Sequence, residues 1–294
     1  MDTLYRQAIL ILAHNEVDHL AALCKKLSEC FCVYVHFDAK NYARNIDNLK
    51  RHLNIPNVYL FSKHEVNWGA FSVIEATMYL ISEALKNTNI EYMHLMSGQD
   101  WIARPVSEIY KYFCDNNSIY MTYAPANYIQ LRFGNVEDWQ KLYYPYDIIN
   151  RRSFIGSVFE KISILIQKIF RIDKLKKYKI TETIYKGSQW WSIPRDTIEY
   201  IFREYTYNTS LVKVFRTGFC ADEMFFQTII CNSDLYAHRI INDNMRYVAW
   251  QKKHCSYPAI IDEYDLDTIK RGNYFFIRKV SNIFSAKLIE NLNC

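Results

Sequence analysis

Short apolar runs alternate with amphipathic stretches through the first 123 residues. Unbroken apolar runs of about four to eight residues are typical of buried strands, and apolar positions three and four apart are typical of helices. The apolar runs predict strands over residues 8–13, 31–37, 58–61, 92–96 and 119–123. The amphipathic stretches predict helices over residues 17–28, 46–53, 72–86 and 106–113. Strands that alternate with helices predict an α/β fold with a parallel, Rossmann-type sheet.

Polar residues follow three of these predicted strands. They form the stretches Ala13-His14-Asn15, His36-Phe37-Asp38 and Ser97-Gly98-Gln99-Asp100. Because open α/β sheets bind ligands at the carboxyl ends of their strands, we expect a binding site there. No strand is followed by a dinucleotide-binding or P-loop glycine pattern, which argues against a dinucleotide oxidoreductase and a P-loop NTPase.

The stretch 219–232 combines two adjacent acids with an apolar helical pattern. Asp222 occupies the expected N-cap, Glu223 opens the first turn, and the apolar residues that follow at 225, 226, 229 and 230 share one helix face. The positive end of a helix dipole favours ionised carboxylates, so an acid here could act as a general base. The alternative is that both acids only cap a helix. Another strand is expected over residues 187–193 and another helix over 195–205.

The positive charge of the chain is concentrated in residues 151–179. This segment holds nine Lys or Arg and two acids, a net charge of +7, whereas the whole chain carries +5. Residues 154–170 within it place their apolar side chains on one helical stripe. A basic amphipathic helix can lie on an anionic membrane surface. The alternative is an ordinary packed helix with a solvated basic end.

Length and composition set the outer limits. With 294 residues, half of them hydrophobic, the chain can form one large domain. No apolar run reaches 18 residues and no signal-peptide pattern is present, so we expect a cytoplasmic protein. Peripheral contact with the inner face of the membrane stays open. The eight cysteines include no Cys-x-x-Cys pair, so we expect free thiols rather than a zinc or redox site.

Eight stretches, in order along nearly the whole chain, together resemble the core-2/I-branching β-1,6-N-acetylglucosaminyltransferases, a family that also contains peptide O-xylosyltransferases. They are Ala8–His14, Val33–Asp38, Val66–Ser72, His94–Asp100, Gly187–Trp191, Asp222–Thr228, Met245–Trp250 and Phe276–Lys279. The resemblance implies a GT-A-like α/β fold, a UDP-sugar donor, inversion at the anomeric carbon and no metal requirement. It implies a single domain over residues 1–294, with a nucleotide-sugar-binding half (1–123) and an acceptor-binding and catalytic half (124–294).

The resemblance also assigns roles to individual residues. Glu223 matches the catalytic base. The expected donor-binding residues are Ala13, His14, Asp38, Trp68, Gly69, Asp100, Arg278 and Lys279, and the expected acceptor-binding residues are Gln189, Trp190, Asp222 and Trp250. No metal ligand is expected. A second family arginine that binds phosphate has no clear match, and Lys252, Lys253 and Arg271 are its candidate substitutes.

These expectations describe an enzyme that moves N-acetylglucosamine from a UDP-sugar to a glycan hydroxyl, forming a β-linkage in bacterial surface polysaccharide synthesis. The acceptor could be lipid-linked, and no nucleic-acid partner is expected. UDP-xylose is the alternative donor. A different class of function stays open, namely a carbohydrate- or nucleotide-binding module without catalysis.

Overall fold

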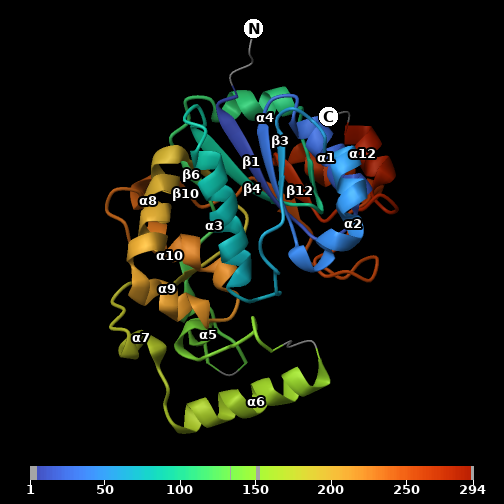
Figure 1. Cartoon of the computed structure of the whole chain (residues 1–294). Helices are drawn as coiled ribbons and strands as arrows, with labels where there is room; N and C mark the ends of the chain where they lie inside the picture. Colours follow the sequence, from blue (N-terminus) through green and yellow to red (C-terminus); the bar gives the residue numbers. More distant parts are fainter. Residues whose placement is uncertain (1–4, 133, 150–152, 293–294) are drawn as a thin grey trace.

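The computed structural model describes residues 5–132, 134–149 and 153–292. The first part of the chain alternates strands and helices as predicted (Figure 1). Its elements are β1 (Gln7–Ala13), α1 (Val17–Leu27), β2 (Cys32–Phe37), α2 (Ala39–His52), β3 (Val58–Phe61), α3 (Ser72–Leu85), β4 (Tyr92–Ser97), β5 (Asp100–Ile102), α4 (Val106–Phe113) and β6 (Ile119–Tyr120).

The second part is mostly helical and adds short strands. Its strands are β7 (Ala124–Pro125), β8 (Tyr185–Lys186), β9 (Ser192–Pro194), β10 (Ile240–Ile241), β11 (Arg246–Val248) and β12 (Phe276–Arg278). Its α-helices are α5 (Asp138–Lys141), α6 (Phe154–Ile169), α7 (Lys174–Lys177), α8 (Arg195–Tyr207), α9 (Thr209–Arg216), α10 (Phe225–Cys231), α11 (Leu266–Arg271) and α12 (Ala286–Leu292).

Seven strands form the main sheet in the order β10-β6-β9-β4-β1-β2-β3. The neighbours β4, β1, β2 and β3 run parallel, and β9 is antiparallel to both β4 and β6. This arrangement confirms the predicted α/β fold and is consistent with a GT-A-like architecture. Strands β9 and β10 come from the second half of the chain, so both halves build one sheet. The functional division at residue 123 stays a prediction.

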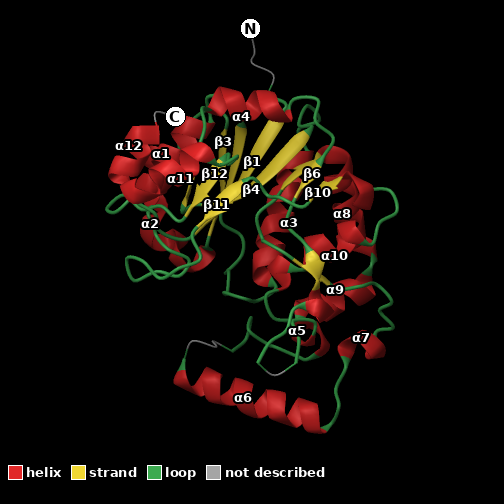
Figure 2. Ribbon diagram, turned by 180° about the vertical axis from the view of Figure 1, so that it is seen from behind, coloured by secondary structure: helices red, strands yellow, loops and turns green. Residues whose placement is uncertain are grey.

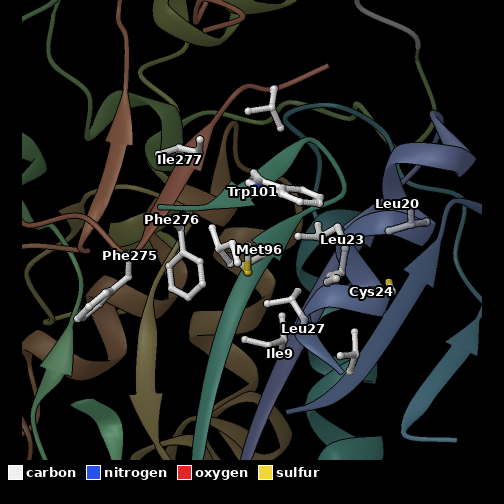
Figure 3. Packing of buried hydrophobic residues seen from close by; sticks show 14 of the residues in the cluster. Ile9, Leu20, Leu23, Cys24, Leu27, Met96, Trp101, Phe275, Phe276 and Ile277 are labelled. Carbon is white, nitrogen blue, oxygen red and sulfur yellow. The ribbon is translucent and has the colours of Figure 1, made fainter. Parts of the chain in front are cut away.

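Helices cover both faces of the main sheet because side chains alternate along each strand. Ile9 of β1 packs with α1 in one core cluster, and its neighbour Leu10 packs with α3 in another. Figure 3 shows the first cluster, in which Ile9, Leu23 of α1 and Phe276 of β12 surround Met96 of β4. The N-terminal strands and the C-terminal β12 therefore share one core.

Three predicted elements differ from the structure. Helix α2 begins at Ala39 rather than at residue 46, because the Asp38 carboxylate accepts a hydrogen bond from Lys40 N and caps it. The strand expected over 119–123 is paired only at 119–120. Of the strand expected over 187–193, only the end is paired, in β9, because Ser188 N instead bonds to the Thr122 side chain.

The seven cysteines within the described ranges are free, as expected, and Cys294 lies outside those ranges. Across those same ranges, every helix is too short or too polar to cross a membrane. Helix α6 lies apart from the sheet, at one end of the molecule, in both Figure 1 and Figure 2.

Candidate active site

The three polar strand ends meet at one edge of the main sheet. Asp38 N, after β2, donates to the Ala13 carbonyl at the end of β1 (2.8 Å), and Gly98 N, after β4, donates to the Leu12 carbonyl (2.9 Å). A Cβ at Gly98 would lie only 2.8 Å from the Ala13 Cβ, so this close approach requires glycine. The site predicted at the carboxyl ends of the strands is therefore assembled around Ala13.

Asp38 connects this edge to the loop that carries Trp68 and Gly69. Its Oδ1 accepts hydrogen bonds from Lys40 N and from Val66 N, each at 3.1 Å. The Asp38 side chain is 8% exposed, with Lys40 Nζ 3.6 Å from Oδ2. Asp38 thus orders both α2 and the start of the Trp68 loop.

The pKa of His14, which directly follows β1, depends on several charged groups near the strand ends. Partial burial lowers its pKa, Asp38 and Glu16 oppose that shift, and the cations Arg278 and Lys279 add to it. These four charged groups lie close enough to His14 to act on its ionisation. The structure therefore brings the two C-terminal cations to the ends of β1 and β2.

Arg278 is fixed by a largely buried ion pair. Strands β12 and β5 are antiparallel with Arg278 opposite Asp100, and Arg278 Nη1 lies 2.7 Å from Asp100 Oδ1. Asp100 is 2% exposed and its Oδ2 accepts from Ser97 N at 2.8 Å. The guanidinium also lies 4.6 Å from the centre of the Trp190 ring. Asp100, expected on the donor side, therefore acts directly on Arg278.

The candidate site contains no group of acids that resembles a metal centre. Across residues 5–132, 134–149 and 153–292, no three His, Cys, Asp or Glu side chains are grouped so that they could hold an ion. Both oxygens of Asp100 already accept from protein donors. Independence from metal stays a prediction.

Lys279 is positioned by its backbone. Its N–H donates to the Ala259 carbonyl (3.2 Å), its carbonyl accepts from Ile261 N (2.9 Å), and the next residue, Val280, donates to the Gln99 carbonyl (2.9 Å). These bonds place Lys279 beside the turn that follows β4.

Two more of the residues predicted to bind substrate, Lys253 and Trp250, lie in the loop after β11. Lys253, one possible substitute for the missing family arginine, binds Asp262 (2.6 Å) and Asp265 (3.0 Å). Trp250 is 66% exposed, and its ring contact is with Tyr257 (5.9 Å between centroids). The charge of Lys253 is therefore already paired with two nearby carboxylates. The contact between Trp250 and Tyr257 does not bring Trp250 to the strand ends.

Glu223 presents a partly exposed carboxylate beside a lysine. Its Oε2 lies 2.6 Å from Nζ of Lys186, and the two side chains are 31% and 22% exposed. Its carbonyl accepts from Gly187 N at 2.8 Å. Lys186 was missed in the sequence, because it directly precedes the recognisable stretch Gly187–Trp191 and carries no pattern of its own.

The N-cap expected at Asp222 is wrong. Residues Ala221–Glu223 form a 3-10 turn closed by the bond from Met224 N to the Ala221 carbonyl, and α10 begins only at Phe225. Oδ1 of Asp222 is buried, and no described residue donates a hydrogen bond to it. Burial, and then the charge of Glu223, raise the pKa of Asp222 to about 7, opposed by a hydrogen bond from its own backbone N–H and by the charge of Lys186. The helix dipole therefore does not keep Asp222 ionised.

Two bridges connect the strand ends to Glu223. On one side, Cys220 N donates to the Gly69 carbonyl (2.9 Å), and the Trp68 ring packs on Phe219 at 5.6 Å. Gly69 has a φ of +73°, which favours glycine. On the other side, Trp190 touches Arg278 and belongs to the segment that begins at Lys186. Gln189 lies half-buried within that segment.

Two comparisons with known proteins bear on the family of this chain. The sequence model of the core-2/I-branching enzyme family matches residues 10–270. A β-glucuronosyltransferase of Arabidopsis thaliana is 19% identical over 112 residues, and the match covers 38% of this chain and 25% of the relative. The family match includes the strand ends, the Trp68 loop and Glu223, but stops before Arg278. Because that model covers most of the chain, the protein belongs to the core-2/I-branching enzyme family.

Proposed function

We propose that the protein transfers a sugar, N-acetylglucosamine as the first choice, from a UDP-sugar to a hydroxyl of a glycan acceptor. The transfer inverts the anomeric carbon, forms a β-linkage and needs no metal. The observation that carries this proposal is the placement of Glu223. Its partly exposed carboxylate stands on a turn that is bonded through Cys220 to the Gly69 loop, and this loop leads to the strand ends near Arg278 and Lys279.

The donor would lie along the strand ends. Asp38 and His14 would hold the nucleoside, and Trp68 and Gly69 would border it. Lys279 and Arg278 would balance the charge of the diphosphate, a task for which cations are suited. Asp100 orients Arg278 by accepting a hydrogen bond from its Nη1. Because a guanidinium has five N–H donors in all, Arg278 would still have donors for the diphosphate. The buried Asp100 would thus have a supporting role for the donor.

The reaction would be a single in-line displacement. The acceptor hydroxyl oxygen forms the new bond to the anomeric carbon while the bond from that carbon to the diphosphate oxygen breaks. Glu223 accepts the hydroxyl proton, and UDP leaves with the electron pair, its charge balanced by Lys279 and Arg278. Because Lys186 occupies Oε2 of Glu223, the other oxygen, Oε1, would take the proton. Trp190, Gln189, Asp222 and Trp250 would contact the acceptor.

The donor sugar has more than one candidate. UDP-xylose is the alternative that the family resemblance supports. The name of the Arabidopsis relative, a β-glucuronosyltransferase, makes glucuronic acid a third candidate for the transferred sugar. We further propose a cytoplasmic enzyme of bacterial surface polysaccharide synthesis with a glycan acceptor that could be lipid-linked. A carbohydrate- or nucleotide-binding module without catalysis is the competing function. It would bind UDP-sugars without consuming them.

Glu223→Gln tests the role of the base. It keeps the size of the side chain but removes the proton acceptor, so UDP release in the presence of acceptor should fall about 10²- to 10⁴-fold. Glu83→Gln is the matched control, because Glu83 pairs with Lys86 at the same distance of 2.6 Å on α3. Near-normal turnover by Glu223→Gln would reject the role. Wild-type protein that binds UDP-sugars but never releases UDP would support the binding module.

Lys279→Ala tests the diphosphate site. Loss of the ammonium should weaken UDP binding at least about tenfold, since hydrogen bonds to charged groups are worth about 1.5–3 kcal/mol. Isothermal titration calorimetry with UDP measures this directly. An unchanged affinity would remove Lys279 from the donor site.

A further inference from the structure

Helix α6 packs against the protein mainly through small and polar residues. Its buried positions are Gly156 and Gln167. The Gln167 side chain accepts from Tyr143 N (2.7 Å), donates to the Tyr143 carbonyl (3.0 Å) and donates to Ser163 Oγ (3.0 Å). An amphipathic helix on a globular protein normally turns its apolar stripe to the core and its polar face to water. Helix α6 does the reverse, because its polar Gln167 faces the protein and its apolar stripe faces outward.

The apolar side of the helix and the residue after it is exposed. At 3.6 residues per turn, the exposed apolar side chains fall within one continuous arc of about 160°. They are Phe154, Ile155, Val158, Phe159, Ile162, Leu165, Ile166, Ile169 and Phe170, which are 41–85% exposed. The largest apolar patch on a typical monomer is about 300–600 Å² and is often functional. A continuous arc of nine large apolar side chains therefore indicates a surface that is covered by a binding partner in the functional state of the protein.

Positive charges border this arc. Lys161 and Lys168 lie on the same helix next to the edge of the arc, and both are exposed. The segment that follows adds the exposed cations Arg171, Lys176, Lys177 and Lys179. Counting 153–179, the described part of the segment holds seven Lys or Arg and two acids, a net charge of +5. One of the seven, Lys174, is buried against the Val214 carbonyl and does not face solvent.

We propose that α6 docks on the surface of an anionic lipid bilayer, with its apolar arc in the acyl boundary and its lysines among the headgroups. A bilayer offers an apolar layer beneath an anionic one, which matches an apolar arc bordered by cations. Each Lys or Arg near such a surface contributes about 1 kcal/mol. A second copy of the chain would bring two strongly cationic faces together.

Helix α6 is connected to the candidate active site through a short series of side-chain contacts. Ile164 of α6 packs on the aromatic cluster of Tyr144, Tyr146 and Phe219. Phe219 contacts Trp68 and is followed, four residues later, by Glu223. The carboxyl ends of the parallel strands face the end of the molecule where α6 lies (Figures 1 and 2). Docking through α6 would therefore turn the site toward the bilayer, although the docking itself does not depend on the proposed chemistry.

Vesicle co-sedimentation tests the proposal. The probes are vesicles of phosphatidylcholine alone and vesicles in which about a third of the lipid is phosphatidylglycerol. Wild-type protein should sediment with the anionic vesicles, at least tenfold less with neutral ones, and less as salt is raised. A variant with Gln at Ile155, Ile162 and Ile169, in the middle of the arc, should bind at least tenfold more weakly. A variant with Gln at Leu235 and Ile283, exposed elsewhere, is the matched control and should bind normally.

The outcomes separate docking from catalysis. Because all three isoleucines are exposed, the triple variant should keep its unfolding temperature and its rate of UDP release from a UDP-sugar in vesicle-free buffer. Equal sedimentation of wild type and triple variant would overturn the proposal. The proposal would also be overturned if the wild type were a dimer that does not bind vesicles and the triple variant were a monomer. The apolar arc would then be an interface between two copies of the chain. If wild-type protein releases no UDP but still binds anionic vesicles, the proposed function fails and the docking stands.

Discussion

Asp222→Asn removes an acid that the fold keeps partly protonated near neutral pH. Oδ1 of Asp222 is buried with no donor among the described residues, and burial together with the charge of Glu223 raises its pKa from the ordinary 3.8 to about 7. The folded state therefore binds this proton more tightly than the unfolded state between about pH 4 and pH 7. Stability must fall as pH rises through that window.

The size of the effect follows from the shift. Each pKa unit corresponds to about 1.36 kcal/mol. Between pH 5 and pH 8.5, Asp222 should lower the free energy of unfolding of the wild type by at most about 3 kcal/mol, as it passes from protonated to ionised in the folded state. Asparagine has nearly the same shape but no proton to lose. The variant should therefore be more stable than the wild type at pH 8.5, and its advantage should shrink toward pH 5.

Urea denaturation of both proteins at several pH values measures this difference. Asp196→Asn is a control of opposite sign. Burial would raise the pKa of Asp196, but the hydrogen bond and charge of Arg239, together with hydrogen bonds from Thr197, outweigh burial and lower that pKa. Removing that carboxylate should cost stability at neutral pH, and the cost should vanish in acid. Parallel stability curves for the wild type and Asp222→Asn would refute the argument, because they would mean that Asp222 is ionised throughout. When Asp222 is protonated, it adds no second negative charge beside the ion pair of Glu223 and Lys186.

Two further substitutions test the framework of the site. Arg278→Met should lower the free energy of unfolding by about 3–5 kcal/mol, because it leaves the carboxylate of Asp100, 2% exposed, without its cation; a loss below about 1 kcal/mol in urea denaturation would mean that water solvates the pair. Gly69→Ala should cost about 1–3 kcal/mol, because the φ of +73° disfavours a side chain and the new Cβ would lie 2.7 Å from Phe219. Unchanged thermal unfolding of Gly69→Ala would show that the loop adjusts.

The sequence by itself determined the local elements and the family. Apolar periodicity placed β1, β3, α3 and α4 to within a residue, because their burial on the sheet imposes patterns that each segment carries alone. The eight motifs identified the family through short stretches of contiguous residues. The same reasoning failed at Asp222, where a 3-10 turn replaces the expected cap and only the fold decides whether a carboxylate is solvated.

Tertiary structure decided the pairings. Nothing local indicates that Asp100 faces Arg278, 178 residues away, or that Lys186 lies against Glu223. These contacts arise when β12 pairs with β5 and when the end of β8 packs against the turn before α10. The helical stripe of α6 was visible in the sequence, but its orientation was not. Apolar residues at helical spacing indicate only that a helix has an apolar side, whereas the packing of Gln167 on Tyr143 determines that this side faces outward.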